Sequence, residues 1–394
     1  MSIREKYDLE PLINATGFPT IVGANVAPPE VIEAVSEVLA VNVEIDELQK
    51  RACAVIAETT GAEAGCVTSS CSSAIAIGVA AAMTGADLAR VMQLPDTSGL
   101  ANEVILQKAH DVNFGAQISQ MVRLSGARVV EIGTANHCDQ FYLSSAITPR
   151  TAAILYVVSG AVNPEAHLLS LEQCVEQGER RGIPVIVDAA AQLDVRPFVR
   201  AGADLVVASG HKVLGASTSG LICGRKALVR ACYLQNWGIG RAMKVGKEGI
   251  VGLMAALEVW SRRDAQAECQ RLAGLADLFA ARLDRPPALH LEKGPAPHRV
   301  ALRVDHGLAG LTAQALANLL REGRPAIWAQ DAVDAAGSGT LTLDLRRLNA
   351  EEAGVVCDRV LEIVEGPPER KRPAEDVPYH DLYRSRERLL RWPD

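Results

Sequence analysis

Short apolar runs bounded by glycine, proline or polar residues recur along the first part of the chain and predict buried strands. These runs cover residues 102–108, 127–132, 151–158, 183–187, 203–208 and 219–224. Stretches with helical periodicity, such as residues 170–181, separate several of them. Because strands that alternate with helices form βαβ units, we predict an α/β fold with a mainly parallel sheet sandwiched by helices.

The chain of 394 residues is longer than one hydrophobic core usually organises, which predicts more than one domain. We expect an N-terminal arm with a helix, a large domain, a smaller α+β domain and a tail, at residues 1–45, 46–260, 261–365 and 366–394. The helix of the arm is expected at residues 29–39, where Pro29 suits an opening turn. The large domain is expected to begin with a helix at residues 47–59.

The helical pattern after Gly246 continues toward Arg285, where Pro286 and Pro287 interrupt it, and this predicts one long helix. The strands of the small domain are expected at residues 298–304, 326–330 and 340–345. In the tail, residues 379–392 again have a helical pattern.

Composition narrows the class of protein. Hydrophobic residues make up 48% and charged residues 22%, as in an ordinary α/β enzyme. The net charge of -7 argues against a nucleic-acid partner, and no apolar run is long enough for a membrane span. Nine cysteines without paired spacing, and no leader sequence, predict a reduced, cytoplasmic chain. A small-molecule substrate is expected from the cofactor chemistry described next.

Two residues predict the chemistry. Lys212, in Ser209-Gly210-His211-Lys212, lies in a turn between two apolar runs, where an amine can form a Schiff base with an aldehyde cofactor. A surface loop lysine is the alternative. Asp188 follows directly on the apolar run at residues 183–187. A carboxylate at such a strand end can hold the ring nitrogen of pyridoxal 5'-phosphate protonated. Asp188 alone is more typical of a helix cap, but together with Lys212 it favours the cofactor.

A serine-rich turn predicts a phosphate site. Residues 65–68 read as a strand, Ser69 to Ser73 as a turn, and the alanine-rich residues 75–83 as a helix. Main-chain N–H groups and the positive end of the helix dipole favour a phosphate at such a point. The alternative is that the serines only cap the helix. Four serines within five positions exceed what a cap requires, which favours phosphate binding.

The chain resembles the fold-type-I pyridoxal-phosphate enzymes, in the selenocysteine-synthase-like branch that includes D-glucosaminate-6-phosphate ammonia-lyase. The resemblance rests on motifs beginning at Leu12, Glu131, Val187, Ser209 and Met243, which read LINATG, EIGTAN, VDAAA, SGHK and MKVGKE. It implies that Lys212 binds the cofactor aldehyde and that Asp188 pairs with its ring. It also implies cofactor contacts from the turn and the lysine motif, at Ser70, Cys71, Ser72, Ser73, Ser209 and His211.

The resemblance implies further roles outside these motifs. His110 is expected to stack on the cofactor ring, although a lone histidine is as often structural. Arg346 is expected to grip the substrate carboxylate, with a buried salt bridge to Asp344 as an equal alternative. Enzymes of this fold usually build their sites across a dimer interface. We therefore expect a homodimer or higher oligomer in which Lys244 and Lys247 reach a neighbouring subunit.

The resemblance favours a lyase that catalyses α,β-elimination, of the ammonia-lyase type, on a small amino acid or amino-sugar acid. A racemase or epimerase is the alternative, with His110 or His211 as a second acid/base group. An aminotransferase, a selenium transferase and a cofactor-binding regulator are further alternatives. Selenocysteine synthases carry an additional N-terminal module for tRNA. Because the first motif begins at residue 12 and the net charge is negative, tRNA is not an expected substrate.

Overall fold

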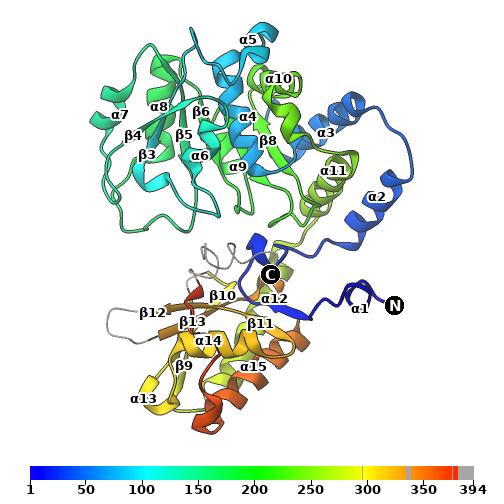
Figure 1. Cartoon of the computed structure of the whole chain (residues 1–394), viewed down its shortest axis with the longest axis vertical. Helices are drawn as coiled ribbons and strands as arrows, with labels where there is room; N and C mark the ends of the chain where they lie inside the picture. The colour runs from blue at the N-terminus through cyan, green and yellow to red at the C-terminus, as the bar shows by residue number, and fades with distance from the viewer. Residues whose placement is uncertain (295, 334–338, 375, 380–394) are drawn as a thin grey trace. The chain divides into compact units, whose positions relative to one another are not determined.

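The chain forms two compact units, which are described separately below. The computed structural model describes residues 1–294, 296–333, 339–374 and 376–379. One unit comprises residues 25–263, and the other comprises residues 1–24 together with the chain from residue 264 onward. Figure 1 shows a broad sheet crossed by helices in the first unit and a smaller sheet backed by helices in the second.

A seven-stranded sheet organises the unit of residues 25–263, with strand order β2-β8-β7-β6-β5-β3-β4. The strands are β2 Ala64–Thr68, β3 Glu103–Gln107, β4 Arg128–Ile132, β5 Thr151–Val157, β6 Val185–Asp188, β7 Leu205–Ser209 and β8 Gly220–Gly224. Strand β8 is antiparallel to both of its neighbours, whereas β7, β6, β5, β3 and β4 pair in parallel. The predicted α/β fold is confirmed, and all strands except β8 end at one edge of the sheet.

Both faces of this sheet are buried except at its edge strand β4, which explains why the inner strands are apolar without alternation. Val185 and Val187 point into a core formed with helices α3, α8 and α11, while Ile186 points into a core formed with α4, α6 and α10. These helices are α3 Ile45–Thr60, α4 Cys71–Thr84, α6 Ile118–Arg123, α8 Leu171–Arg181, α10 Lys226–Leu234 and α11 Lys247–Ser261. The expected helix at residues 29–39 is α2 Pro29–Leu39, which packs on α11.

The other unit combines both ends of the chain. Its antiparallel sheet has the strand order β12-β13-β10-β9, and β1 Leu12–Asn14 pairs in parallel with β11 Ala326–Trp328. The four strands are β9 Leu289–Lys293, β10 Arg299–Val304, β12 Gln330–Val333 and β13 Gly339–Asp344. The helices α12 Ala265–Leu283, α14 Ala313–Glu322 and α15 Ala350–Glu365 share a core around the fully buried Phe279.

The expected single helix from Gly246 toward Arg285 is wrong, because the structure has two helices, α11 and α12. Asp264 separates them, and its side chain accepts hydrogen bonds from the N–H groups of Gln266 and Ala267 as the N-cap of α12. Strand β9 was not expected from the pattern. The helix predicted at residues 379–392 lies outside the described residues, apart from Tyr379. No helix among the described residues combines the length and apolarity needed to cross a membrane.

Candidate active site at the carboxyl edge of the large sheet

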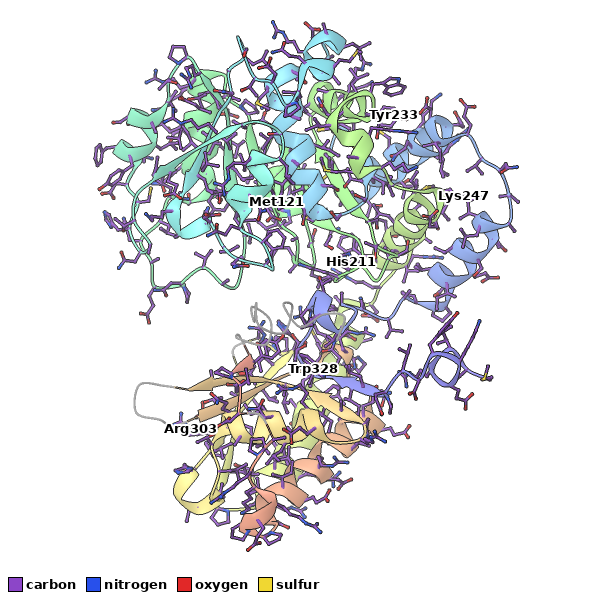
Figure 2. The ribbon with its side chains drawn as sticks, in the orientation of Figure 1. Met121, His211, Tyr233, Lys247, Arg303 and Trp328 are labelled. Carbon is purple, nitrogen blue, oxygen red and sulfur yellow. The ribbon has the colours of Figure 1, made fainter. Side chains whose placement is uncertain are left out.

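The strand register brings the predicted residues to one edge of the seven-stranded sheet. Thr68 at the end of β2 and Ser209 at the end of β7 both pair with Gly220, the first residue of β8. In the neighbouring pair, Asp188 lies beside Val207 of β7. The turn after β2, the turn after β7 and the end of β6 therefore meet, although up to about 140 residues separate them in sequence. Figure 2 labels His211, the neighbour of Lys212, in this part of the unit.

The serine-rich turn caps helix α4. The Ser70 side chain accepts a hydrogen bond from the Ser73 N–H at 3.1 Å, and the Ser73 hydroxyl oxygen accepts one from the Ser70 N–H at 2.9 Å. These reciprocal bonds form a capping box, so two of the four predicted residues serve the helix itself. The capping alternative therefore accounts for Ser70 and Ser73.

The same turn leaves donors free. The N–H groups of Cys71 and Ser72, in the first turn of α4, make no hydrogen bond with any described residue. A Cβ atom on Gly220 would lie 2.2 Å from the carbonyl oxygen of Ser70, so only glycine lets β8 approach this turn so closely. The positive end of α4 therefore offers two unused N–H groups at the carboxyl edge, as an anion site requires.

Asp188 is buried and only partly satisfied. Its Oδ1 atom accepts hydrogen bonds from the Ala190 N–H at 3.0 Å and from the Cys71 thiol at 3.3 Å. Its Oδ2 atom has no hydrogen-bond partner among the described residues. Burial raises the pKa of Asp188, and the bonds from Cys71 and Ala190 and the charge of Lys212 oppose that rise. The carboxylate thus retains one oxygen for a ligand.

Lys212 lies on the turn that joins β7 to β8, and it is half-buried. A Cβ atom on Gly210 would lie 2.2 Å from the Ser219 Oγ atom, so the start of this turn is tightly enclosed. The Asn25 side chain donates a hydrogen bond to the Lys212 carbonyl oxygen at 2.5 Å. The Asn25 Oδ1 atom is buried and has no hydrogen-bond partner in the described parts of the chain. The sequence did not point to Asn25, because it lies 187 residues before Lys212 and only the fold brings the two residues together.

Ser209 and His211 belong to the same turn. The Ser209 hydroxyl lies 3.1 Å from Nδ1 of His211. Burial, followed by the positive charge of Lys212, lowers the pKa of His211. A neutral His211 is therefore favoured beside the lysine.

His110 is 2% exposed and fixed by the backbone, because its Nδ1 atom accepts the Val157 N–H at 3.2 Å. Burial lowers the pKa of His110 to about 4, so the ring is neutral at pH 7. An acceptor at Nδ1 places the remaining proton on Nε2. The ring also meets Tyr156 edge to face, with centroids 4.7 Å apart. Val157 is the register partner of Asp188, so His110 is held beside the same edge.

Arg346 lies in the other unit, where it binds Asp344 in a bidentate ion pair, with Nε 2.9 Å from Oδ1 and Nη2 2.5 Å from Oδ2. Its guanidinium also lies over the Phe18 ring, 4.5 Å from the centroid. The salt-bridge alternative is therefore realised, and binding of the substrate carboxylate by Arg346 stays a prediction. On α11, labelled in Figure 2, Lys247 donates to the carbonyl oxygens of Leu39 and Val41 at the end of α2.

No group of three or more metal-ligating side chains occurs within the described parts of the chain. The doubly wound sheet, its lysine turn, its buried aspartate and the anion site of α4 define the class of fold-type-I pyridoxal-phosphate enzymes. Within this class, the chain belongs to the L-seryl-tRNA selenium transferase (SelA) family, whose profile matches residues 12–282. The family and its fold, both predicted from the motifs, are confirmed, and the chain is an enzyme that depends on pyridoxal phosphate.

Two curated relatives are nearly equally similar to the chain. D-glucosaminate-6-phosphate ammonia lyase of Salmonella typhimurium is 39% identical over 92% of this chain and 98% of the relative. The 5'-C-glycyluridine monooxygenase-decarboxylase of a Streptomyces species is 38% identical over 90% of each chain. The L-seryl-tRNA(Sec) selenium transferase of Geotalea uraniireducens is 28% identical over 70% of this chain and 62% of the relative.

The solved structures agree on the fold. A structure of D-glucosaminate-6-phosphate ammonia-lyase is 38% identical and superposes with a TM-score of 0.84, covering 93% of this chain and 98% of that chain. A serine palmitoyltransferase from Sphingomonas wittichii, 16% identical, has a TM-score of 0.58 over 90% of this chain and 87% of its own. The second similarity shows the fold alone.

Proposed function

We propose that the chain is a pyridoxal-phosphate-dependent ammonia-lyase that catalyses α,β-elimination on an amino-sugar acid. The observation that carries the proposal is the similarity to D-glucosaminate-6-phosphate ammonia lyase along nearly the whole of both chains. The residues at the carboxyl edge of the sheet fit the cofactor. Two free N–H groups at the start of α4 suit its phosphate, the free Oδ2 of Asp188 suits its ring nitrogen, and Lys212 offers an amine for its aldehyde.

Bound pyridoxal phosphate supplies an electron sink that stabilises negative charge at the α carbon of the substrate. The free Oδ2 atom of Asp188 would pair with the ring nitrogen and favour the protonated ring, which maintains that sink. Lys212 would hold the aldehyde of the cofactor through Nζ. The same amine would serve as the base for the α proton of the substrate.

The other residues of the site position the cofactor and the lysine turn. The N–H groups of Cys71 and Ser72 hold the phosphate at the positive end of α4. His110 is neutral and is fixed through Nδ1, so its imidazole can lie against the cofactor ring without adding a charge there. Ser209 and His211 keep the lysine turn in place through their mutual hydrogen bond.

The direct test is an assay with D-glucosaminate 6-phosphate, in which ammonia and the 2-oxo acid product are measured together. We expect both in equal amounts, and none from the Lys212→Ala variant. Serine, threonine and alanine of both configurations serve as comparison substrates. Interconversion of enantiomers without 2-oxo acid from any of them would instead identify a racemase.

A second function is supported by the nearly equal similarity to 5'-C-glycyluridine monooxygenase-decarboxylase. That name describes oxygen incorporation and loss of carbon dioxide, neither of which accompanies ammonia elimination. The same assay therefore includes an oxygen electrode and a carbon dioxide trap, with 5'-C-glycyluridine as substrate. Oxygen uptake with carbon dioxide release, and no ammonia from the sugar acid, would replace the lyase proposal.

We further propose that the enzyme is a cytoplasmic homodimer. Support comes from nine free cysteines, eight of them at least partly buried, and from exposed apolar side chains between residues 26 and 45. These side chains are Val26, Ile32, Leu39, Val41, Val43 and Ile45. Sedimentation equilibrium should give twice the chain mass of 41.9 kDa, and a monomer at micromolar concentration would contradict the dimer.

A further inference from the structure

The Cys71 thiol makes a contact that the proposed reaction does not itself require. Cys71 is the first residue of α4, and Asp188 is the last residue of β6, 117 positions later. The Cys71 side chain is 7% exposed, and its Sγ atom lies 3.3 Å from the Asp188 Oδ1 atom. A buried thiol in contact with a buried carboxylate is a specific arrangement, because most buried cysteines pack only against apolar groups.

The proton of this contact lies on sulfur. Burial raises the pKa of Cys71 well above its ordinary value, and the charge of Asp188 raises it further. Cys71 is therefore the donor and Asp188 the acceptor. The titratable groups that act on Asp188 are this thiol and the Lys212 amine, and both favour the ionised carboxylate against the effect of burial.

The contact also determines which oxygen is free. The thiol and the Ala190 N–H both bind Oδ1, from two different segments of the chain, and together they fix the carboxylate plane. The remaining oxygen, Oδ2, has no partner among the described residues. A carboxylate held in this way presents one defined oxygen to a ligand and loses little rotational freedom when the ligand binds.

We propose that Cys71 is a positioning residue that holds Oδ1 of Asp188 and so presents Oδ2, ionised, to the ring nitrogen of the cofactor. The inference rests on the proposed function of Asp188. It gives Cys71 two tasks at opposite ends of one ligand, since its N–H group lies in the anion site of α4 while its thiol acts on Asp188. The start of α4 and the end of β6 are thereby coupled through one side chain.

The experiment compares Cys71→Ala, which removes the donor, with Cys71→Ser, which replaces it by a hydroxyl. Each protein is loaded with pyridoxal phosphate, and the visible absorbance of the bound cofactor is titrated against pH. Without the thiol, Asp188 holds less negative charge, the ring carries less positive charge, and the cofactor–lysine nitrogen keeps its proton to higher pH. For Cys71→Ala we expect the midpoint to rise by about 0.5 pH unit and the cofactor dissociation constant by about threefold.

The serine variant and a matched control separate this role from packing. Cys71→Ser should return the midpoint to within about 0.2 pH unit of the parent protein, because a hydroxyl is also a donor. Cys174→Ala, which empties a similarly buried thiol site on α8, should leave the midpoint unchanged. Thermal unfolding of all variants reports any general loss of packing.

The outcomes are distinct. An unchanged midpoint in Cys71→Ala, or a serine variant that behaves like the alanine variant, overturns the role of Cys71 while the proposed function stands. If the parent protein takes up no pyridoxal phosphate, or if Asp188→Asn leaves the midpoint unchanged, the proposed role of Asp188 fails first. A rise in Cys71→Ala that serine reverses supports the inference.

Discussion

Two buried aspartates, one in each unit, show opposite ways of satisfying a carboxylate. Asp344 is 2% exposed, and its two oxygens bind the Arg346 guanidinium, while Oδ1 also accepts the Arg346 N–H. Asp188 is 5% exposed, yet among the described residues only its Oδ1 atom has partners, and these are an amide and a thiol. A buried carboxylate with a full set of partners serves the fold, whereas one with a free oxygen is available to a ligand.

The sheets explain why the two residues differ. Asp188 ends a strand whose parallel neighbours end at the same edge, so several loops meet around it and leave room for a ligand. Asp344 ends β13, and its antiparallel partner across the sheet is Arg299, the first residue of β10. At Asp344 one strand ends where its neighbour begins, and the 3-10 turn that follows β13 supplies Arg346 as the partner of the carboxylate.

The largest effect is expected at the lysine that faces the incompletely satisfied aspartate. Lys212→Ala should abolish covalent attachment of the cofactor and lower turnover by about 10³-fold or more, because the proposed base is lost. Borohydride reduction followed by peptide mass analysis locates the attachment in the parent protein. A reduced adduct on another lysine would remove Lys212 from the site.

Substituting each aspartate by asparagine tests whether Asp188 and Asp344 have different roles. Asp188→Asn should lower turnover by about 10- to 1000-fold, since a neutral amide is a poor partner for a protonated ring, while thermal unfolding stays close to that of the parent. Asp344→Asn should leave the partly buried Arg346 charge without its partner and destabilise its unit by about 3 kcal/mol.

Urea unfolding and steady-state turnover are measured for both variants. If Asp188→Asn loses stability and keeps its turnover, Asp188 is a structural residue like Asp344. If Asp344→Asn unfolds like the parent protein, full pairing of a buried carboxylate does not identify a structural role in this chain.

A pH dependence is expected from His110. In the unfolded chain this group takes up a proton below about pH 6.5, whereas burial prevents protonation in the folded chain until about pH 4. Stability is therefore lost as the pH falls from 6.5 toward 4, by about 3 kcal/mol in total. In His110→Gln, whose amide oxygen can still accept the Val157 N–H, unfolding in urea should depend less on pH across this window. Equal pH dependence in the two proteins would contradict a buried, neutral His110.

The smallest effect is expected at Asn25. Asn25→Ala removes the hydrogen bond to the Lys212 carbonyl oxygen and should lower turnover by about 3- to 10-fold, as one net hydrogen bond of about 1 kcal/mol implies. Asn25→Asp, which keeps the size but loses the donor, should behave alike. Full activity in both variants would show that the lysine turn is held without the Asn25 hydrogen bond.

Much of the large sheet could be predicted because its central strands are apolar on both faces and each strand is separated from the next by a helix or a turn. The expected runs at residues 127–132, 151–158 and 203–208 correspond to β4, β5 and β7 within two residues at each end. The helical pattern after Gly246 was not divided correctly, because the polar residues 261–263 are compatible with a continuing helix and only the backbone shows that Asp264 caps α12.

The apolar runs were sufficient to predict that Lys212, Asp188 and the turn before α4 lie at strand ends, and their roles toward a cofactor stay predictions. They could not show that Ser70 and Ser73 are occupied by the capping box, or that Arg346 is already paired with Asp344. These hydrogen bonds and ion pairs depend on which donors and acceptors lie within about 3 Å of one another, a distance that sequence spacing does not determine.

The sequence by itself determined the alternation of apolar strands with helices, and the family through its motifs. Local periodicity and residue type encode both of these. Only the tertiary structure decided that Asn25 binds the Lys212 turn and that the Cys71 thiol binds Asp188. These pairs are separated by 187 and 117 residues. Cys71 meets Asp188 because the register of β2, β8, β7 and β6 brings the start of α4 and the end of β6 to one edge of the sheet, whereas Asn25 precedes α2 and reaches the lysine turn because α2 packs on α11.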